Sequence, residues 1–146
     1  MTLSVADGTG TIGQQVNVQL DALGIGTPGL GAYTVDVAFD TNIVTAVSCN
    51  GNSGPGVTPV APVNTPAFEA PGLSFCNPKY AENTVRSVGA VAEGASGDVP
   101  LAVITFTCDA AGTTGLTISV STFADATVGS PTDINHTEDN GTITCS

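Results

Sequence analysis

The clearest pattern along the chain is an alternation of apolar and polar side chains within residues 29–48. A period of two predicts a strand with one face toward the core and the other toward solvent. The core-facing positions are Tyr33, Val35, Val37 and Phe39, and Thr34, Asp36 and Ala38 lie between them. The turn formers Asp40, Thr41 and Asn42 follow, and residues 43–47 are again rich in β-branched side chains. This stretch therefore predicts a strand, a tight turn and a second strand.

Shorter alternating segments follow the same pattern elsewhere in the chain. They predict strands over residues 3–5, 15–22, 73–76, 83–92, 101–107, 116–121 and 142–145. Residues 24–29 and 94–98 are interpreted as connections, and Asn140-Gly141 predicts a two-residue hairpin turn before the last strand. About nine short strands, with no internal repeat and no linker, are typical of a two-sheet sandwich. We therefore expect one all-β domain over residues 1–146.

Residues 50–72 have a different character. Prolines at 55, 59, 62, 66 and 71 leave no room for a long ladder, because proline donates no backbone hydrogen bond. Cys49 and Cys76 flank the segment, which favours a loop that is pinned at both ends. Two hypotheses stay open for it, a recognition element and a cover over a sheet edge.

The charge balance excludes several classes of partner. The chain has 13 acidic residues against 2 basic ones, and its formal net charge is −11. Binding to nucleic acid or to anionic lipid needs a surplus of Lys and Arg, so neither is expected. No apolar run is long enough for insertion into a membrane. An apolar content of 41%, arranged in clear alternation, indicates a folded domain rather than a disordered chain.

The cysteines indicate an oxidising compartment. Cys49, Cys76, Cys108 and Cys145 form no C-x-x-C pair and have no neighbouring histidine, so zinc or redox chemistry is not expected. Disulfides fit a secreted, extracellular or cell-surface protein. Four cysteines allow three pairings. We favour Cys49 with Cys76 across the long loop, and Cys108 with Cys145 between a late strand and the C-terminus.

Three stretches, in order, are similar to one known family. Residues 13–18 read Gly-Gln-Gln-Val-Asn-Val, and residues 30–44 are an apolar strand that ends in Phe-Asp-Thr-Asn-Ile-Val at 39–44. The third is a run of apolar-alternating segments at 101–106, 115–118 and 140–144. Together they resemble the cohesin domain, the module of bacterial scaffolding proteins that captures dockerin modules. The resemblance covers essentially the whole chain.

This resemblance implies both a fold and a binding surface. The fold would be a nine-stranded jelly-roll β-sandwich, the architecture that many carbohydrate-binding modules share. A dockerin-type partner, itself calcium-bound, would lie across one flat outer sheet that includes the strand at 29–39 and the strand around Arg86. The candidate partner-binding residues are the outward residues of these two strands: Ala32, Thr34, Asp36, Ala38, Thr84, Arg86 and Val88.

Catalysis is not expected. His136 is the only histidine, no G-x-S-x-G motif occurs, and a chain with no Trp and 2 Tyr has few rings to line a sugar cleft. Asp40-Thr41-Asn42 and residues 137–140 offer oxygen ligands for calcium, but turn capping explains them as well. We therefore predict no catalytic residue, no cofactor and no metal site in this chain.

Two alternative functions stay open. A structural or adhesive subunit could self-associate by lending an edge strand, and a terminal strand left unpaired would favour it. A carbohydrate-binding module would need an exposed aromatic platform, for which Tyr80 is the one candidate. Arg86, one of only 2 cations, is predicted to be a cross-strand partner of a carboxylate or a recognition group. The predicted outer face otherwise has few large side chains that could act as hot spots.

Overall fold

The structure is a computed structural model that describes residues 1–49 and 73–146, and every regular element in these residues is a strand. The predicted roles of residues 50–72 lie outside the described residues. No helix that is long and apolar enough to cross a membrane occurs in the described ranges. The strands are β1 (Thr2–Val5), β2 (Gly8–Gly10), β3 (Gln15–Ala38), β4 (Val44–Cys49), β5 (Leu73–Ala81), β6 (Thr84–Cys108), β7 (Gly112–Asp125), β8 (Thr137–Asp139) and β9 (Gly141–Cys145).

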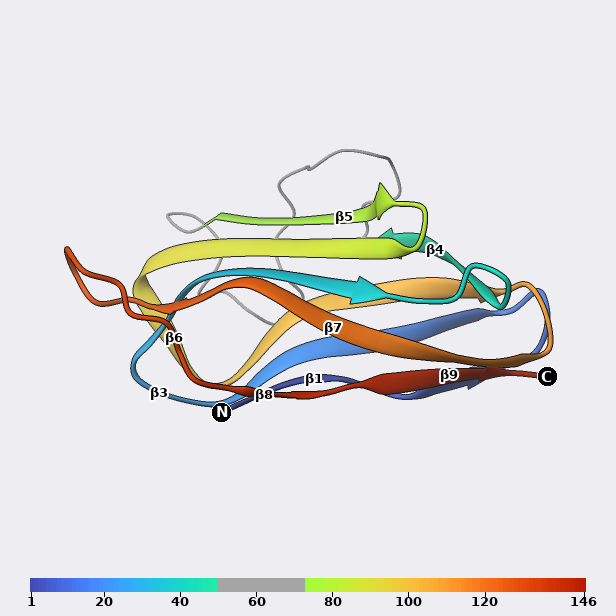
Figure 1. The fold of residues 1–146 in the computed structure, drawn as a ribbon, viewed down its shortest axis with the longest axis horizontal. Coiled ribbons are helices and arrows are strands. Elements are labelled where there is room, and N and C mark those ends of the chain that lie inside the picture. The colour runs from blue at the N-terminus through green and yellow to red at the C-terminus, as the bar shows by residue number, and fades with distance from the viewer. Residues whose placement is uncertain (50–72) are drawn as a thin grey trace.

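Two long strands, β3 and β6, run through both layers of the sandwich. They are antiparallel, so that residues 15–22 of β3 pair with residues 99–107 of β6, and residues 32–38 pair with residues 84–90. Figure 1 shows β6 bending back on itself at one end of the molecule. Residues 24–29 and 94–98, predicted as connections, thus lie inside strands. That prediction was wrong because register shifts between Leu20 and Ala32 interrupt the alternation without ending the ladder.

The pairing of the strands defines two layers. One contains β5, the first half of β6, the second half of β3, and β7. The other contains β4, the second half of β6, the first half of β3, then β1 and β8. β9 pairs with β7 and with β2, which extends the first layer at one end. The predicted all-β sandwich is confirmed.

The hairpin predicted at Asn140-Gly141 is wrong. β8 pairs in parallel with β1, whereas β9 pairs antiparallel with β7 and in parallel with β2. The dipeptide therefore passes the chain from one layer to the other. The Asn140 side chain has a local role, because its Oδ1 accepts a hydrogen bond from the backbone N–H of Ile118 at 2.9 Å. The two strands β2 and β8 were not predicted, since their pairing is with distant segments.

The core lies between the two layers and is built as the alternation predicts. Tyr33, Val35 and Val37 are buried, and Phe39 and Phe106 meet edge to face with ring centroids 5.1 Å apart. The largest fully buried side chains are Tyr33, Phe106, Leu3, Leu20, Leu30, Leu101, Ile104, Leu116, Ile143, Val18 and Val35.

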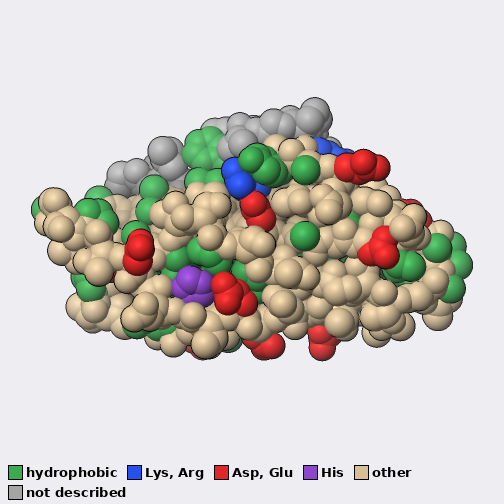
Figure 2. All heavy atoms as spheres, viewed as in Figure 1, with side chains coloured by type: hydrophobic (Ala, Val, Ile, Leu, Met, Phe, Trp, Pro, Cys, Tyr) green, Lys and Arg blue, Asp and Glu red, His purple; other side chains and the backbone are tan. Residues whose placement is uncertain are grey.

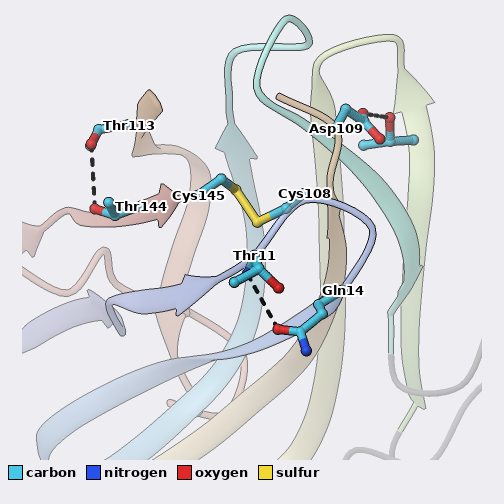
Figure 3. The surroundings of a disulfide bond; sticks show 8 residues. Thr11, Gln14, Cys108, Asp109, Thr113, Thr144 and Cys145 are labelled. Carbon is cyan, nitrogen blue, oxygen red and sulfur yellow. Dashed lines mark hydrogen bonds between the residues drawn. A yellow bond between two sulfur atoms is a disulfide. The ribbon is translucent and has the colours of Figure 1, made fainter. Parts of the chain in front are cut away.

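Both disulfides have the favoured pairing. Cys49 joins Cys76, which links the end of β4 to the middle of β5, and Cys108 joins Cys145, which links the ends of β6 and β9. Figure 3 shows the second bridge beside the turn at residues 11–14, where the backbone N–H of Thr11 donates to the side-chain oxygen of Gln14. The bridges therefore close the sandwich at points where strands of different layers come together.

Candidate functional site

The exposed side of the first layer is a surface made of residues that lie in register. Positions 32, 34, 36 and 38 of β3 lie opposite positions 90, 88, 86 and 84 of β6. The same β3 positions lie opposite residues 124, 122, 119 and 117 of β7. We call this surface the outer face. Its members are Ala32, Thr34, Asp36 and Ala38 of β3, Thr84, Arg86, Val88 and Ala90 of β6, Thr117, Ser119, Thr122 and Ala124 of β7, and Phe75 of β5.

Every residue that the sequence predicted for partner binding belongs to the outer face. Their chain neighbours Tyr33, Val35 and Val37 point the other way and are buried. The predicted residues form three direct cross-strand pairs, with Asp36–Arg86 in the middle, and Ala32 lies opposite Ala90, which was not predicted. The position of these residues is therefore as expected, and their role in binding stays a prediction.

Asp36 and Arg86 form a two-pronged ion pair near the middle of the outer face. Arg86 Nε donates to Asp36 Oδ1 at 2.7 Å, and Arg86 Nη2 donates to Asp36 Oδ2 at 2.8 Å. The hydrogen bond to Asp36 raises the pKa of Arg86, while burial opposes the rise. A planar guanidinium held at two points has a fixed direction. Both side chains are half-buried, so the pair is a rigid part of the surface.

Tyr80 covers the guanidinium from outside. Its ring centroid lies 3.7 Å from Arg86 Cζ, which is a cation–π contact. Tyr80 reaches this position because β5 has an irregularity between Asn77 and Ala81. Within it, the backbone N–H of Lys79 donates to Asn77 Oδ1 at 2.9 Å. A turn built around Asn77 thus places the ring over the ion pair.

The outer face carries no net charge, although the chain as a whole is at −11. Among its members only Asp36 and Arg86 are charged, and they neutralise each other. The other members are small, hydroxyl-bearing or apolar. Figure 2 shows one side of the molecule on which most of the surface is neither acidic nor basic. A partner can therefore approach this face without desolvating a field of like charges.

His136 has the contacts of a packed loop residue. Its Nδ1 lies 3.0 Å from the carbonyl oxygen of Ile134, its Nε2 lies 3.3 Å from Glu138 Oε1, and its ring meets Phe123 edge to face. The segment Asp40-Thr41-Asn42, whose oxygens could in principle bind calcium, forms a turn. In it the backbone N–H of Asn42 donates to Asp40 Oδ1 at 2.9 Å. Within residues 1–49 and 73–146, no group of three or more His, Cys, Asp or Glu is placed to hold a metal ion.

Sequence reasoning missed two large side chains at this site. Phe75, a member of the outer face, lies opposite Val88 and is half-buried. Tyr80, which lies over Arg86, was considered only as a sugar platform. One face of the Tyr80 ring is occupied by Arg86, which counts against that use. The short Asn77-Pro78 turn signal next to Tyr80 could have indicated that the ring leaves the regular alternation.

Comparison with known proteins places this fold. No protein-family model matches the chain, and no curated protein matches it. Solved structures do match. A non-cellulosomal cohesin from the archaeon Archaeoglobus fulgidus has a TM-score of 0.73 at 14% identity, over 99% of this chain and 90% of that chain. The seventh ScaB type I cohesin from Pseudobacteroides cellulosolvens has a TM-score of 0.74 at 17% identity, over 99% and 91%.

A type I cohesin–dockerin complex from Clostridium thermocellum also matches, with a TM-score of 0.75 at 13% identity over 99% of this chain and 92% of the matched chain. The likeness spans both layers and almost the full length of each chain. The domain is a cohesin-like β-sandwich. At these identities the comparison establishes the fold, and function has to be argued from the outer face.

Proposed function

We propose that this domain is a non-catalytic, extracellular protein-interaction module that binds a dockerin-type partner through the outer face. The observation that carries the proposal is the Asp36–Arg86–Tyr80 cluster at the centre of an outer face with no net charge. Tyr and Arg are the side chains that most often dominate binding energy at protein interfaces. Here they are fixed in place before any partner arrives, which lowers the entropic cost of association.

The strand pairing also supports binding by a face rather than by an edge. In the layer that carries the outer face, β6 and β3 are paired on both sides, so their backbone groups are already satisfied. A partner lying over these strands would bind through side chains. The solved complex from Clostridium thermocellum is described as a cohesin–dockerin complex, which makes a dockerin the first partner to test. Such a partner would bring its own calcium.

Two observations count against the alternative functions. The terminal strands β1 and β9 are both paired within the chain, whereas polymerisation by strand exchange would be favoured by an unpaired terminal strand. Tyr80 stacks on Arg86 instead of presenting a bare ring to a sugar. The two disulfides support an extracellular location.

Calorimetric titration of the purified, oxidised domain against dockerin modules encoded in the same genome tests the proposal. We expect binding in calcium and none in EDTA. Asp36→Arg and Arg86→Glu should each weaken binding by about 2 kcal/mol or more, because each places two like charges side by side at the interface. Combining the two changes restores an ion pair with reversed polarity, so it should recover stability without recovering affinity.

A matched control lies on the outside of the opposite layer. There Thr105 Oγ1 donates to Asn17 Oδ1 at 2.7 Å, across the same two strands β3 and β6. Asn17→Arg should leave dockerin affinity unchanged. If no dockerin binds, and light scattering shows discrete oligomers or fibres of the domain alone, the proposal is wrong and the structural-subunit hypothesis replaces it.

A further inference from the structure

An apolar pocket lies at one end of the outer face. The pocket has a volume of about 470 Å³ and is lined by Gly31, Ala32, Ala90, Ala126, Val128 and Pro131. Ala32 and Ala90 are a cross-strand pair of the outer face itself. The pocket, which we call the end pocket, therefore continues the outer face toward the loop at residues 126–131.

The wall of the end pocket is built in advance. Asp125 Oδ1 accepts hydrogen bonds from the backbone N–H groups of Thr127 at 3.1 Å and Thr132 at 2.9 Å, and this closes the loop. The backbone N–H of Ala126 donates to the carbonyl oxygen of Gly29 at 3.0 Å, which holds the loop against β3. A Cβ on Gly31 would lie 2.8 Å from Ala126 Cα, so glycine permits this close approach.

The chemistry of the lining selects an apolar occupant. The side chains that line the end pocket are mostly methyl groups of alanine, with Val128 and Pro131 at the loop. Asp125 also contributes to the lining, but its Oδ1 is engaged by the loop backbone. Val128 at the rim is 95% exposed. Covering it would remove apolar surface from water at little cost in polar desolvation.

We propose that the end pocket receives an aliphatic side chain of the protein partner that binds the outer face. This inference rests on the proposed function and adds a second anchor to it. Ala32 lies four positions before Asp36 on β3, which corresponds to about 13 Å along an extended strand. One rigid partner element would therefore place a polar contact over Asp36 and Arg86, and an aliphatic side chain about 13 Å away. In an α-helix that separation is about eight or nine residues.

Two variants test the end pocket without touching the ion pair. Val128→Asp adds a charge at the rim on a side chain that makes few internal contacts, and Ala90→Leu fills the pocket from an exposed position. Each should weaken dockerin binding about tenfold or more, the effect of losing one buried aliphatic contact. Ile12→Asp is the matched control, because Ile12 is also an exposed aliphatic residue, 56% exposed, and its backbone N–H donates to the carbonyl oxygen of Ser146, next to Cys145.

The outcomes separate this inference from the proposed function. If the wild-type domain binds a dockerin, and Val128→Asp and Ala90→Leu bind within about twofold of it, the end pocket is not an anchor and the proposed function stands. If the wild-type domain binds no dockerin, both proposals fail. Methyl cross-saturation in the complex gives a check without mutation. Transfer to the methyl groups of Ala90 and Val128 is expected, and transfer confined to residues around Arg86 would overturn the inference.

Discussion

Tyr33 and Gly89 lie directly opposite each other on β3 and β6, and the tyrosine ring fills the space that a side chain at position 89 would need. A Cβ on Gly89 would be 2.8 Å from Tyr33 Cζ and 2.9 Å from its hydroxyl oxygen. Tyr33 is 1% exposed, so its ring has no free volume into which to move. This pair sits immediately beneath the outer face, between Val88 and Ala90. The glycine thus lets a large ring pack under a surface of small side chains.

We therefore expect Gly89→Ala to destabilise the domain by about 2 kcal/mol, the usual cost of overpacking a core. Urea unfolding followed by circular dichroism measures the change. Gly115→Ala is the control, because a Cβ there meets only Thr117 Oγ1 at 4.0 Å and should cost little. Equal stability of the two variants would mean that the Tyr33 ring is not held where we describe it.

Tyr33 should also make the domain sensitive to alkali. Burial raises the pKa of Tyr33 to about 12, with a hydrogen bond from Ser87 acting in the opposite direction. The unfolded chain loses this proton near pH 10, so the neutral ring stabilises the fold fully below that pH. The contribution is lost as pH rises from 10 toward 12, and it amounts to about 3 kcal/mol.

Tyr33→Phe should remove this dependence. We expect its unfolding free energy to fall less between pH 9 and about pH 11 than that of the wild type, in short equilibrations that spare the disulfides. Tyr80→Phe serves as the comparison. It leaves the buried Tyr33 in place and should follow the wild-type curve. A Tyr33→Phe domain with the full alkaline loss of stability would assign that loss to other groups.

The alternation of apolar and polar residues predicted most of the outer face, because in a strand each residue faces the opposite side from its chain neighbours. Alternation in β3 and in the first half of β6 fixed which side chains face the core, and hence that Asp36 and Arg86 share the exposed side. Composition added the sign of the charge and the presence of disulfides. These are properties that a segment carries by itself.

The parts that failed depend on distant segments. Gly24 and Pro28 are local signals of a connection, yet pairing of Ile25 and Leu30 with β6 keeps residues 24–29 within one long strand. Asn140-Gly141 has the sequence of a hairpin turn. However, β8 before it pairs with β1, and β9 after it pairs with β7, so β8 and β9 do not pair with each other. The contact of Tyr80 with Arg86 arises from an irregularity in β5, and the spacing of residues in the sequence does not encode it.

The Cys108–Cys145 bridge should contribute more stability than its local packing suggests. It closes a loop with a sequence separation of 37 residues, and in the chain-entropy model such a loop is worth about 4 kcal/mol. Replacing both cysteines with alanine should lower the urea midpoint accordingly. Replacing Cys49 and Cys76, with a separation of 27, should cost slightly less by the same model. If either double variant unfolds at the wild-type urea concentration, the entropic account is wrong for that bridge.

Tyr80 should matter more for binding than for folding. Its ring is 46% exposed and contacts the guanidinium of Arg86, and a cation–π contact at such a site is worth about 0.5–1 kcal/mol. Tyr80→Leu should therefore lower the unfolding free energy by no more than about 1 kcal/mol. The coupling energy to Arg86→Gln in a double-mutant cycle should be of the same size, because the two side chains touch.

Dockerin affinity should respond more strongly to the same change. At an interface the ring is a large, rigid contact that also shields the ion pair from water, so Tyr80→Leu should weaken binding by about tenfold or more. Tyr80→Phe keeps the ring and should stay within about threefold of the wild type, unless the hydroxyl itself contacts the partner. Calorimetry on the three proteins decides the point. A Tyr80→Leu domain that binds as tightly as the wild type would move the interface away from the Asp36–Arg86–Tyr80 cluster.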